Sequence, residues 1–252
     1  MNTYESYEAS LQSRHWGYEE LSGPEYWGDI NKNFHLCKTG KNQSPINLAK
    51  RHLEKLPTNA VKFSYNLNNN GTSYNLTNNG HSIQLSFPAD SKNTFIHDGI
   101  EYNLSQFHFH APSEHHIENH HSPFEIHFVH TTQDENRNTK IHVVGIFAEF
   151  GEGDKFIDQF IPYIENLEKV GTVVKVNNLI LPDLNELFNE LAWDYEGSLT
   201  TPPCSEGVKW IVSNKVLTIN LEQLLAFQRV MPFNARPTRF NNNVLNKDLK
   251  NN

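Results

Sequence analysis

The chain has 252 residues, with 21 Lys and Arg against 29 Asp and Glu and a formal net charge of -8. This length suits one large domain or two small ones. The acidic balance, without any Lys/Arg-rich run, argues against a nucleic-acid-binding protein. A mean hydropathy of -0.61 and the lack of any apolar run of about 18 residues argue against a membrane span.

We expect one domain over residues 1–252, because no linker rich in Pro, Gly or Ser and no internal repeat divides the chain. The first residues, "MNTYESYEAS", lack the charged and apolar regions of a signal peptide. The protein is therefore expected either to be cytosolic or to be a mature form that carries an added Met.

Short segments that alternate in the manner of strands dominate residues 44–150. The Asn-rich tract at 66–80 is interpreted as turns and a hairpin. The strand-like segments are "HSIQLSF" at 81–87, "NTFIHDG" at 93–99, "SQFHFH" at 105–110, "FEIHFVH" at 124–130 and "IHVVGIFAEF" at 141–150.

Three later segments place apolar residues at the 3.6-residue spacing of a helix. They cover residues 155–169, 183–191 and 220–229, and Asn220 is suited to cap the last of them. Their apolar stripes are assigned to the core. The pattern predicts a mainly β (α+β) fold with short peripheral helices.

Eight of the 14 histidines lie between positions 108 and 130. Composition alone leaves open that such a tract is a solvated surface that binds metal adventitiously. The strand pattern favours a specific site, because His108 and His110 share one face while Phe107 and Phe109 share the other.

A third histidine, His127, lies in a later predicted strand and reaches the face of His108 and His110 if the two strands pair. Three neutral imidazoles, without a cysteine to close the shell, are the ligand set of a catalytic zinc site. Gln106 lies two residues before His108 on the same face and is a candidate acceptor for its ring N–H. Glu125 stands in the same relation to His127. The other histidines of the tract are expected to be solvated, namely His115, His116, His120, His121 and His130.

Cys37 and Cys204 are the two cysteines, and neither belongs to a C-x-x-C pair. Thiolate metal binding and thioredoxin-like redox chemistry therefore have little support. The residues alone leave two alternatives, unrelated buried thiols or one long-range disulfide. A disulfide would imply an oxidising compartment.

An ordered set of motifs resembles the α-class carbonic anhydrases. In chain order it comprises "HWGYE", "GPEYW", "KNQSPINL", "NNGHS", the histidine strands, "EGSLTTPPCSEGVKWIV" and "NARPTRF". Each motif is a weak signal singly, but the ordered set is specific. The resemblance covers a core from about residue 15 to 240, with flexible termini outside it. It implies a single domain built on a large, mostly antiparallel central β-sheet.

The resemblance also implies a ligand set and a reaction. His108, His110 and His127 would bind one Zn²⁺, with Gln106 and Glu125 as hydrogen-bond partners. Zinc lowers the pKa of its bound water to about 7, a value already known for carbonic anhydrases. Zinc-bound hydroxide would then attack carbon dioxide and give bicarbonate and a proton.

Further residues match catalytic positions of the family. Thr200 matches the hydroxyl that orients the hydroxide, and Glu114 matches the carboxylate that accepts its proton. His81 matches the proton shuttle, a role that suits the near-neutral pKa of histidine. Tyr18 and Asn79 match residues that order the intervening water.

Gln84 stands where many relatives have Asn. Because the Gln side chain is a longer amide, we expect it to affect the shuttle rather than the zinc chemistry. The substrate is small and uncharged, so its pocket should be small and apolar. Residues that match the family's pocket are Val129, Val143, Leu199, Thr201, Val208 and Trp210.

Cys37 and Cys204 match the pair that forms a disulfide in secreted and periplasmic relatives. In the entropic view, a bond across so long a loop contributes roughly 4 to 5 kcal/mol at most. The resemblance therefore implies a periplasmic or secreted protein, with the cytoplasm as the alternative. It leaves a homodimer open, although no self-complementary patch stands out in the sequence.

The predicted function is the reversible hydration of carbon dioxide, with ester hydrolysis as a side activity. The competing hypothesis is a catalytically silent carbonic-anhydrase-like binding module. Such modules characteristically lose one or more zinc histidines, whereas all three are present here. The implied partners are carbon dioxide, bicarbonate and water, without nucleic acid.

Overall fold

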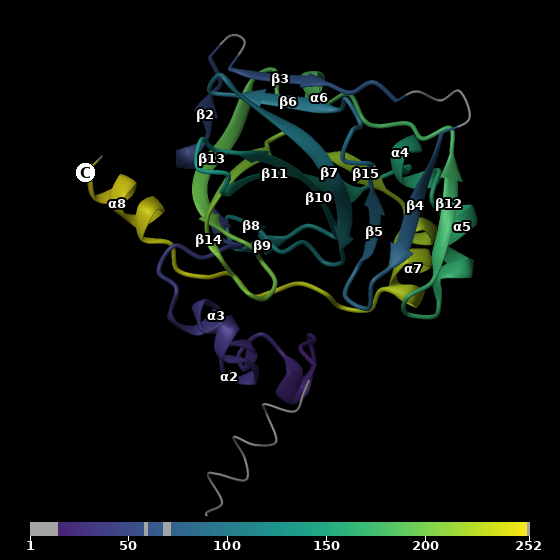
Figure 1. Cartoon of the computed structure of the whole chain (residues 1–252), viewed down its shortest axis with the longest axis horizontal. Helices are drawn as coiled ribbons and strands as arrows, with labels where there is room; N and C mark the ends of the chain where they lie inside the picture. The colour runs from purple at the N-terminus through teal and green to yellow at the C-terminus, as the bar shows by residue number, and fades with distance from the viewer. Residues whose placement is uncertain (1–14, 58–59, 68–71, 251–252) are drawn as a thin grey trace, which may run out of the picture.

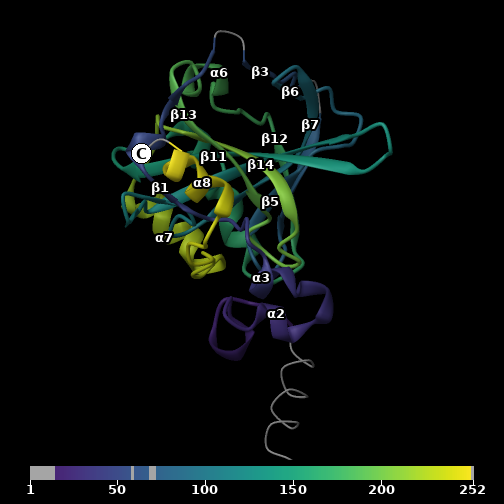
Figure 2. The same ribbon diagram turned by 90° about the vertical axis from the view of Figure 1, so that its left-hand side faces the viewer.

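The computed structural model describes residues 15–57, 60–67 and 72–250. Its centre is a curved sheet of twelve strands among these residues (Figures 1 and 2). The strands are β2 (Glu54–Lys55), β3 (Val61–Ser64), β4 (Ser73–Asn78), β5 (Ile83–Ser86), β6 (Thr94–His97), β7 (Ile100–His110), β10 (Phe124–Gln133), β11 (Thr139–Phe150), β12 (Val173–Asn177), β13 (Leu191–Ser198), β14 (Glu206–Ser213) and β15 (Leu217–Ile219).

The main path of the sheet runs β12-β4-β5-β7-β10-β11-β14-β13-β2, with β3, β6 and β15 attached beside it. Most neighbours are antiparallel, but β11 pairs in parallel with β14 and β15. The expected mainly β, mostly antiparallel fold is therefore confirmed, and the sheet is mixed. A second, small sheet joins β1 (Asn47–Leu48), β8 (His116–Ile117) and β9 (His120–His121).

Short helices lie at the periphery (Figure 1). They are α2 (Trp27–Ile30), α3 (Leu36–Thr39), α4 (Lys155–Asp158), α5 (Ile161–Ile164), α6 (Leu184–Leu187), α7 (Leu221–Val230) and α8 (Asn242–Lys250), with 3-10 turns η1 (Glu20–Ser22), η2 (Lys32–Phe34), η3 (Lys50–His52) and η4 (Glu165–Leu167). Among the described residues, no helix is both long and apolar enough to cross a membrane.

The five predicted strand segments are confirmed as β5, β6, β7, β10 and β11. Within the Asn-rich tract, β4 pairs with β5 and β12, whereas residues 68–71 lie outside the described part of the chain. The N-terminal segment expected to be flexible, residues 1–14, lies outside it as well. Residues 242–250, beyond the expected core, form α8.

The helix predicted over 220–229 is confirmed as α7, where Asn220 and Gln223 form a capping box. A single helix over 155–169 is wrong, because the segment divides into α4, α5 and η4. Pro162 stands in the first turn of α5, and its missing N–H prevents α4 from continuing. The prediction for 183–191 is too long, because Leu191 leaves the helical turn to pair with Lys55 in the sheet.

Strand alternation sorts the two faces of β7 as its sequence predicts. Phe107 and Phe109 are fully buried in the larger hydrophobic core. The intervening His108 and the following His110 therefore face the other side, next to a smaller core that contains Trp210. The aromatic side fixes the strand, and the opposite side carries the polar site.

Candidate metal centre

His108 and His110 of β7 meet His127 of β10 on one face of the sheet. In the antiparallel register His127 stands opposite His108, and Glu125 stands opposite His110. Potential ligand atoms of the three imidazoles all lie within 4.8 Å of one another. β10 begins 14 residues after β7 ends, and the pairing of these two strands produces the three-histidine cluster that the positions of the histidines predict.

One nitrogen of each ring is engaged by a hydrogen bond. His108 Nδ1 lies 2.9 Å from Gln106 Oε1, and His127 Nε2 lies 2.8 Å from Glu125 Oε1. His110 Nδ1 lies 2.8 Å from the carbonyl oxygen of Asn234. These oxygens accept, so each engaged nitrogen carries the hydrogen and the other nitrogen keeps its lone pair.

The donor set fits a zinc ion. His110 Nε2 is buried and has no hydrogen-bond partner in the described part of the chain, as expected for a nitrogen reserved for a cation. Burial, followed by His110 and His127, holds the pKa of His108 well below its ordinary value. Burial also lowers the pKa of His110. Neutral imidazoles are the form that binds metal.

Glu125 connects the cluster to a second buried histidine, His115. Its Oε1 lies 2.7 Å from His115 Nδ1, and its Oε2 accepts from the backbone N–H groups of Glu114 and His115. Burial alone would raise the pKa of Glu125, but His115 and His127 hold it well below its ordinary value. His115, Glu125 and His127 also satisfy the spacing of a metal group. Their short N···O distances are those of hydrogen bonds, so this trio orients His127.

The network continues from His115 toward the loop that carries Thr200. His115 Nε2 lies 2.7 Å from the Tyr195 hydroxyl, which lies 2.8 Å from Ser44 Oγ. Ser44 and Ser198 exchange two hydrogen bonds, each backbone N–H donating to the other's hydroxyl. A buried chain of hydrogen bonds therefore runs from the cluster to the residue two positions before Thr200.

Glu114 is fully buried beside the cluster. Its Oε1 accepts from the backbone N–H of Arg236 at 3.0 Å. Its Oε2 has no hydrogen-bond partner in the described residues and lies 3.4 Å from His110 Nε2. Thr200 is buried too, but no hydrogen bond joins its hydroxyl to Glu114 among these residues, so that pairing stays a prediction.

The residues matched to the substrate pocket come together in the smaller core. Val129 stands opposite Val143 in β10 and β11, and Val143 stands opposite Trp210 of β14. Val208 is buried in the same cluster, and Leu199 packs against it. Thr201 follows Thr200 in the adjoining turn, where its carbonyl accepts from the N–H of Cys204.

His81 lies in the turn between β4 and β5. Asn79 Oδ1 accepts from the backbone N–H groups of His81 and Ser82, and Asn79 Nδ2 donates to Gln84 Oε1. Burial, followed by the nearby His15, lowers the pKa of His81 from 6.5 to about 4. Burial, followed by the Glu114 charge, raises the pKa of Tyr18 well above its ordinary value. The structure thus brings Asn79, His81 and Gln84 together.

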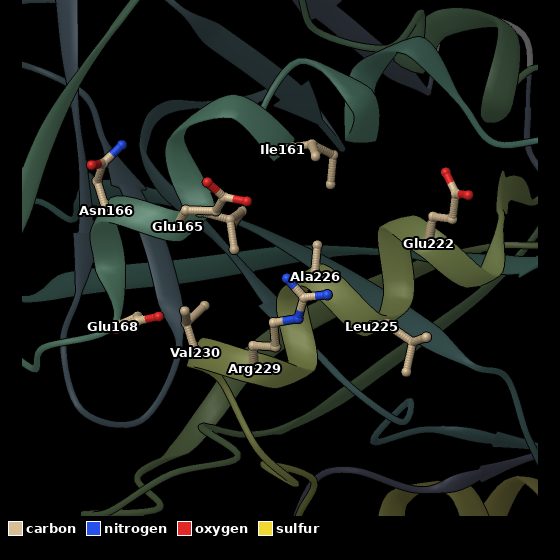
Figure 3. A pocket seen from close by; sticks show the side chains of 10 residues that line it. Ile161, Glu165, Asn166, Glu168, Glu222, Leu225, Ala226, Arg229 and Val230 are labelled. Carbon is tan, nitrogen blue, oxygen red and sulfur yellow. The ribbon is translucent and has the colours of Figure 1, made fainter.

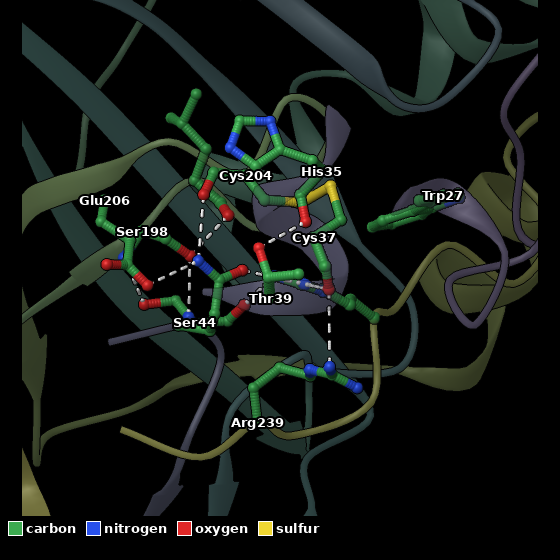
Figure 4. The surroundings of a disulfide bond; sticks show 12 residues. Trp27, His35, Cys37, Thr39, Ser44, Ser198, Cys204, Glu206 and Arg239 are labelled. Atoms are coloured by element: carbon green, nitrogen blue, oxygen red, sulfur yellow. Dashed lines mark hydrogen bonds between the residues drawn. A yellow bond between two sulfur atoms is a disulfide. The ribbon is translucent and has the colours of Figure 1, made fainter. Parts of the chain in front are cut away.

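Cys37 and Cys204 form a disulfide across 167 residues, with Cα atoms 5.0 Å apart (Figure 4). The prediction of a bond is confirmed. Gln43 Nε2 donates to the carbonyl of Cys204, and the Arg236 guanidinium donates to the carbonyl of Cys37. The bond therefore joins α3 to the turn after Thr200.

Two of the histidines expected at a solvated surface are buried, so that expectation is wrong for His115 and His130. His115 is held between Glu125 and Tyr195, and His130 Nε2 lies 2.6 Å from the Tyr65 hydroxyl. Hydrogen bonds from residues distant in sequence make burial of these polar rings tolerable. His120 and His121 are exposed as expected, and His116 is half-buried.

A groove of about 700 Å³ lies elsewhere, between α5, η4 and α7 (Figure 3). Glu165, Glu168 and Glu222 line it together with Arg229. None of the residues predicted for the site contributes to it. This groove is therefore separate from the histidine cluster.

Comparison with known proteins agrees with the motifs. A model of the family described as eukaryotic-type carbonic anhydrase matches residues 22–252. A carbonic anhydrase of Klebsiella pneumoniae is 36% identical over 233 residues, which cover 89% of this chain and 87% of that protein.

Solved structures show the same likeness. The α-carbonic anhydrase of Thermovibrio ammonificans, in complex with the inhibitor sulfanilamide, is 38% identical, with a TM-score of 0.77. The match covers 89% of this chain and 95% of that one. A fungal α-carbonic anhydrase of Aspergillus oryzae is 30% identical with a TM-score of 0.81, over 94% and 99% of the two chains.

Proposed function

We propose that this chain, which belongs to the eukaryotic-type, or α-class, carbonic anhydrases and is an enzyme of that family, hydrates carbon dioxide. The reaction is proposed to occur at a zinc ion held by His108, His110 and His127. The observation that carries the proposal is the convergence of their ligand atoms within 4.8 Å, with the other nitrogen of each ring engaged by an acceptor. The donor set matches that of catalytic zinc sites.

When bound, zinc supplies a Lewis acid that lowers the pKa of a water molecule to about 7, a value already known for carbonic anhydrases. The protein contributes orientation. Gln106 and Glu125 fix two of the rings directly, and the carbonyl of Asn234 fixes the third. Their hydrogen bonds leave the opposite nitrogens aimed at one point.

Thr200 and Glu114 are proposed to orient the attacking oxygen. Glu114 is acceptor-only when ionised, and its Oε1 already accepts from Arg236 N–H. Its Oε2 is buried without a partner among the described residues and is therefore suited to accept the Thr200 hydroxyl proton. A hydroxyl that donates there is left to accept a hydrogen bond from the nucleophile. This order of donors fixes which lone pair of the nucleophile faces the substrate.

Carbon dioxide is proposed to bind against the smaller core. Val143, Val208 and Trp210 are buried there, with Val129 and Leu199 packed against them. An uncharged, apolar substrate gains from leaving water for such a wall. The same wall leaves little room for an ester, so ester hydrolysis is proposed only as a side activity.

The proton released in each turnover is proposed to leave through His81. Asn79 and Gln84 are hydrogen bonded to each other beside it and would order the intervening water together with Tyr18. His81 lies in the turn between β4 and β5 rather than within the sheet, and its stack against Trp16 lowers its pKa and makes it a weaker base than an exposed histidine.

Stopped-flow carbon dioxide hydration tests the proposal, on one preparation before and after zinc removal and readdition, with metal content assayed in parallel. The expected result is zinc-dependent activity near one zinc per chain. His108→Ala should lose both zinc and activity, whereas His120→Ala, a change at an exposed histidine, should keep both. One zinc per chain without hydration would instead favour the silent binding module.

We also propose a periplasmic or secreted location, supported by the Cys37–Cys204 disulfide, since such bonds persist in oxidising compartments. Fractionation of the native host tests this location. A homodimer stays a prediction, and sedimentation velocity at several concentrations checks it.

A further inference from the structure

The hairpin β8–β9 carries a pair of histidines that the hydration chemistry does not use. His116 and His121 stand directly opposite each other in its antiparallel register. Their ring centroids are 3.9 Å apart, with the ring planes at 61°. His120 pairs with Ile117 instead, so its side chain points to the other face of the hairpin.

The hairpin is held in place at its turn. Glu118 and Asn119 both have positive φ, as the central residues of a type I′ turn require. Asn119 exchanges two hydrogen bonds with Asn47 of β1, and the Glu118 carboxylate accepts from the backbone N–H of Lys50. The two imidazoles are therefore presented by a backbone that is fixed before any ligand arrives.

Each ring has a nitrogen suited to a metal. His121 Nδ1 lies 2.7 Å from the carbonyl of Ser113 and donates to it, which leaves the lone pair on Nε2. The His110 ring in the main cluster is held in the same manner, by a backbone carbonyl at Nδ1. His116 Nε2 is buried and has no hydrogen-bond partner among the described residues.

From this geometry we propose that His116 and His121 form a second metal site, which binds a divalent transition metal such as Zn²⁺, Ni²⁺ or Cu²⁺ through two imidazole nitrogens. Imidazoles that share one ion have their centroids about 5 Å apart, as the rings of the main cluster do at 4.6 to 5.3 Å. The exposed His121 ring would therefore turn away from its 3.9 Å contact with His116 when both nitrogens bind the ion. Imidazole suits these three metals. Water completes the coordination, because His121 is exposed.

The protonation state of the pair agrees with this assignment. Burial, followed by His121 and His115, lowers the pKa of His116 below its ordinary value. A neutral His116 is therefore the main form at pH 7, and no proton has to leave before a metal binds. A bound ion would also give the partnerless Nε2 of His116 a ligand bond.

The test is a calorimetric titration of the zinc-loaded full chain with Ni²⁺ at pH 7.5, because nickel added and zinc retained can be counted separately. Four proteins are compared: wild type, His116→Gln, His121→Gln and the control His120→Gln. We expect wild type and the control to bind one more Ni²⁺ per chain than either His116→Gln or His121→Gln. Ni²⁺ should also raise the Tm of the first two more than that of the others.

Equal Ni²⁺ binding in all four proteins would overturn the proposal, and so would loss in only one of the two pair variants. His121 is exposed, so His121→Gln keeps the test valid even if the half-buried His116 proves necessary for folding. The inference is independent of the proposed hydration function. Zinc content and hydration activity, measured on the same samples, report on that function separately.

Discussion

The His81 ring lies flat against the Trp16 indole, with centroids 3.5 Å apart and planes at 9°. His15 is stacked next to it, its centroid 5.2 Å from that of His81. Burial in this stack, and then the His15 charge, lower the pKa of His81 to about 4. In this position His81 is neutral at pH 7 and is a weaker base than an exposed histidine.

Trp16→Ala should therefore raise the pKa of His81 from about 4 toward the ordinary 6.5, because the indole that desolvates the ring is gone. An NMR titration of the His81 ring protons measures the shift. Turnover in weak buffer should rise, since a shuttle works best with a pKa near the working pH. Phe34→Ala, a change at another aromatic residue of the same N-terminal cluster, is the control. An unchanged His81 pKa in Trp16→Ala would contradict the stacking explanation.

Glu125→Gln should weaken zinc binding by about 10- to 100-fold, the usual effect of losing a hydrogen-bond partner of a ligand. Glu125 accepts four hydrogen bonds, from the rings of His115 and His127 and from two backbone N–H groups. An amide would direct its own N–H at one of these donors. Competition with a zinc chelator measures the affinity.

Glu152→Gln is the matched control for that experiment. Glu152 is exposed in the turn after β11 and belongs to neither the cluster nor the β8–β9 hairpin. Its zinc affinity should equal that of wild type. Equal affinity in Glu125→Gln as well would show that the carboxylate does not position His127.

Side-chain periodicity and spacing predict a large part of this structure. The alternation of Phe and His in β7 correctly places His108 and His110 on one face, because strand geometry decides which side chains share a face. Pairing with β10 then adds His127 to them. The helix predicted over 155–169 fails because Pro162 interrupts a continuous apolar stripe. A local backbone restriction overrides the pattern there.

The parts of the site that sequence reasoning missed act through the main chain or across long distances. Asn234 holds His110 with its carbonyl, and Arg236 holds Glu114 with its N–H. The motif "NARPTRF" marks this segment, but side-chain identity does not reveal a backbone contact. His115 appears polar and dispensable in sequence, and its role depends on Tyr195, 80 residues away.

The buried His130 should make the protein sensitive to acid. Burial lowers its pKa from 6.5 to about 3. The unfolded chain therefore binds a proton below pH 6.5 that the folded chain does not, so the stabilising contribution is complete above pH 6.5 and is lost as pH falls toward 3. One such group changes the free energy of unfolding by about 1.4 kcal/mol per pH unit in that window.

Urea unfolding of wild type and His130→Phe between pH 7.5 and pH 5 measures this contribution. The variant should lose less stability than wild type, by about 2 kcal/mol at pH 5. It also leaves the Tyr65 hydroxyl without its partner, a cost present at every pH, so the slopes are compared rather than the absolute values. His120→Phe, at an exposed site, should follow wild type. Parallel slopes for wild type and His130→Phe would refute the assignment.

Removing the Cys37–Cys204 bond should lower both stability and activity. The bond closes a loop of 167 residues. Replacing both cysteines with Ser should lower the free energy of unfolding by up to roughly 4 to 5 kcal/mol, because the unfolded chain gains conformational entropy without the cross-link. Cys204 lies in the turn after Thr200, so this turn also loses its covalent link to α3. We therefore expect slower carbon dioxide hydration in the folded double variant, together with a lower urea midpoint.

Thiol titration separates these effects from a bond that never forms. Wild type purified without reductant should show no reactive thiol in denaturant and two after reduction. If two thiols react before reduction, the bond is not present in the isolated protein and the stability argument fails. If the thiols are blocked but the double variant hydrates carbon dioxide at the wild-type rate, the position of Thr200 depends on the Ser44–Ser198 hydrogen bonds and not on the disulfide.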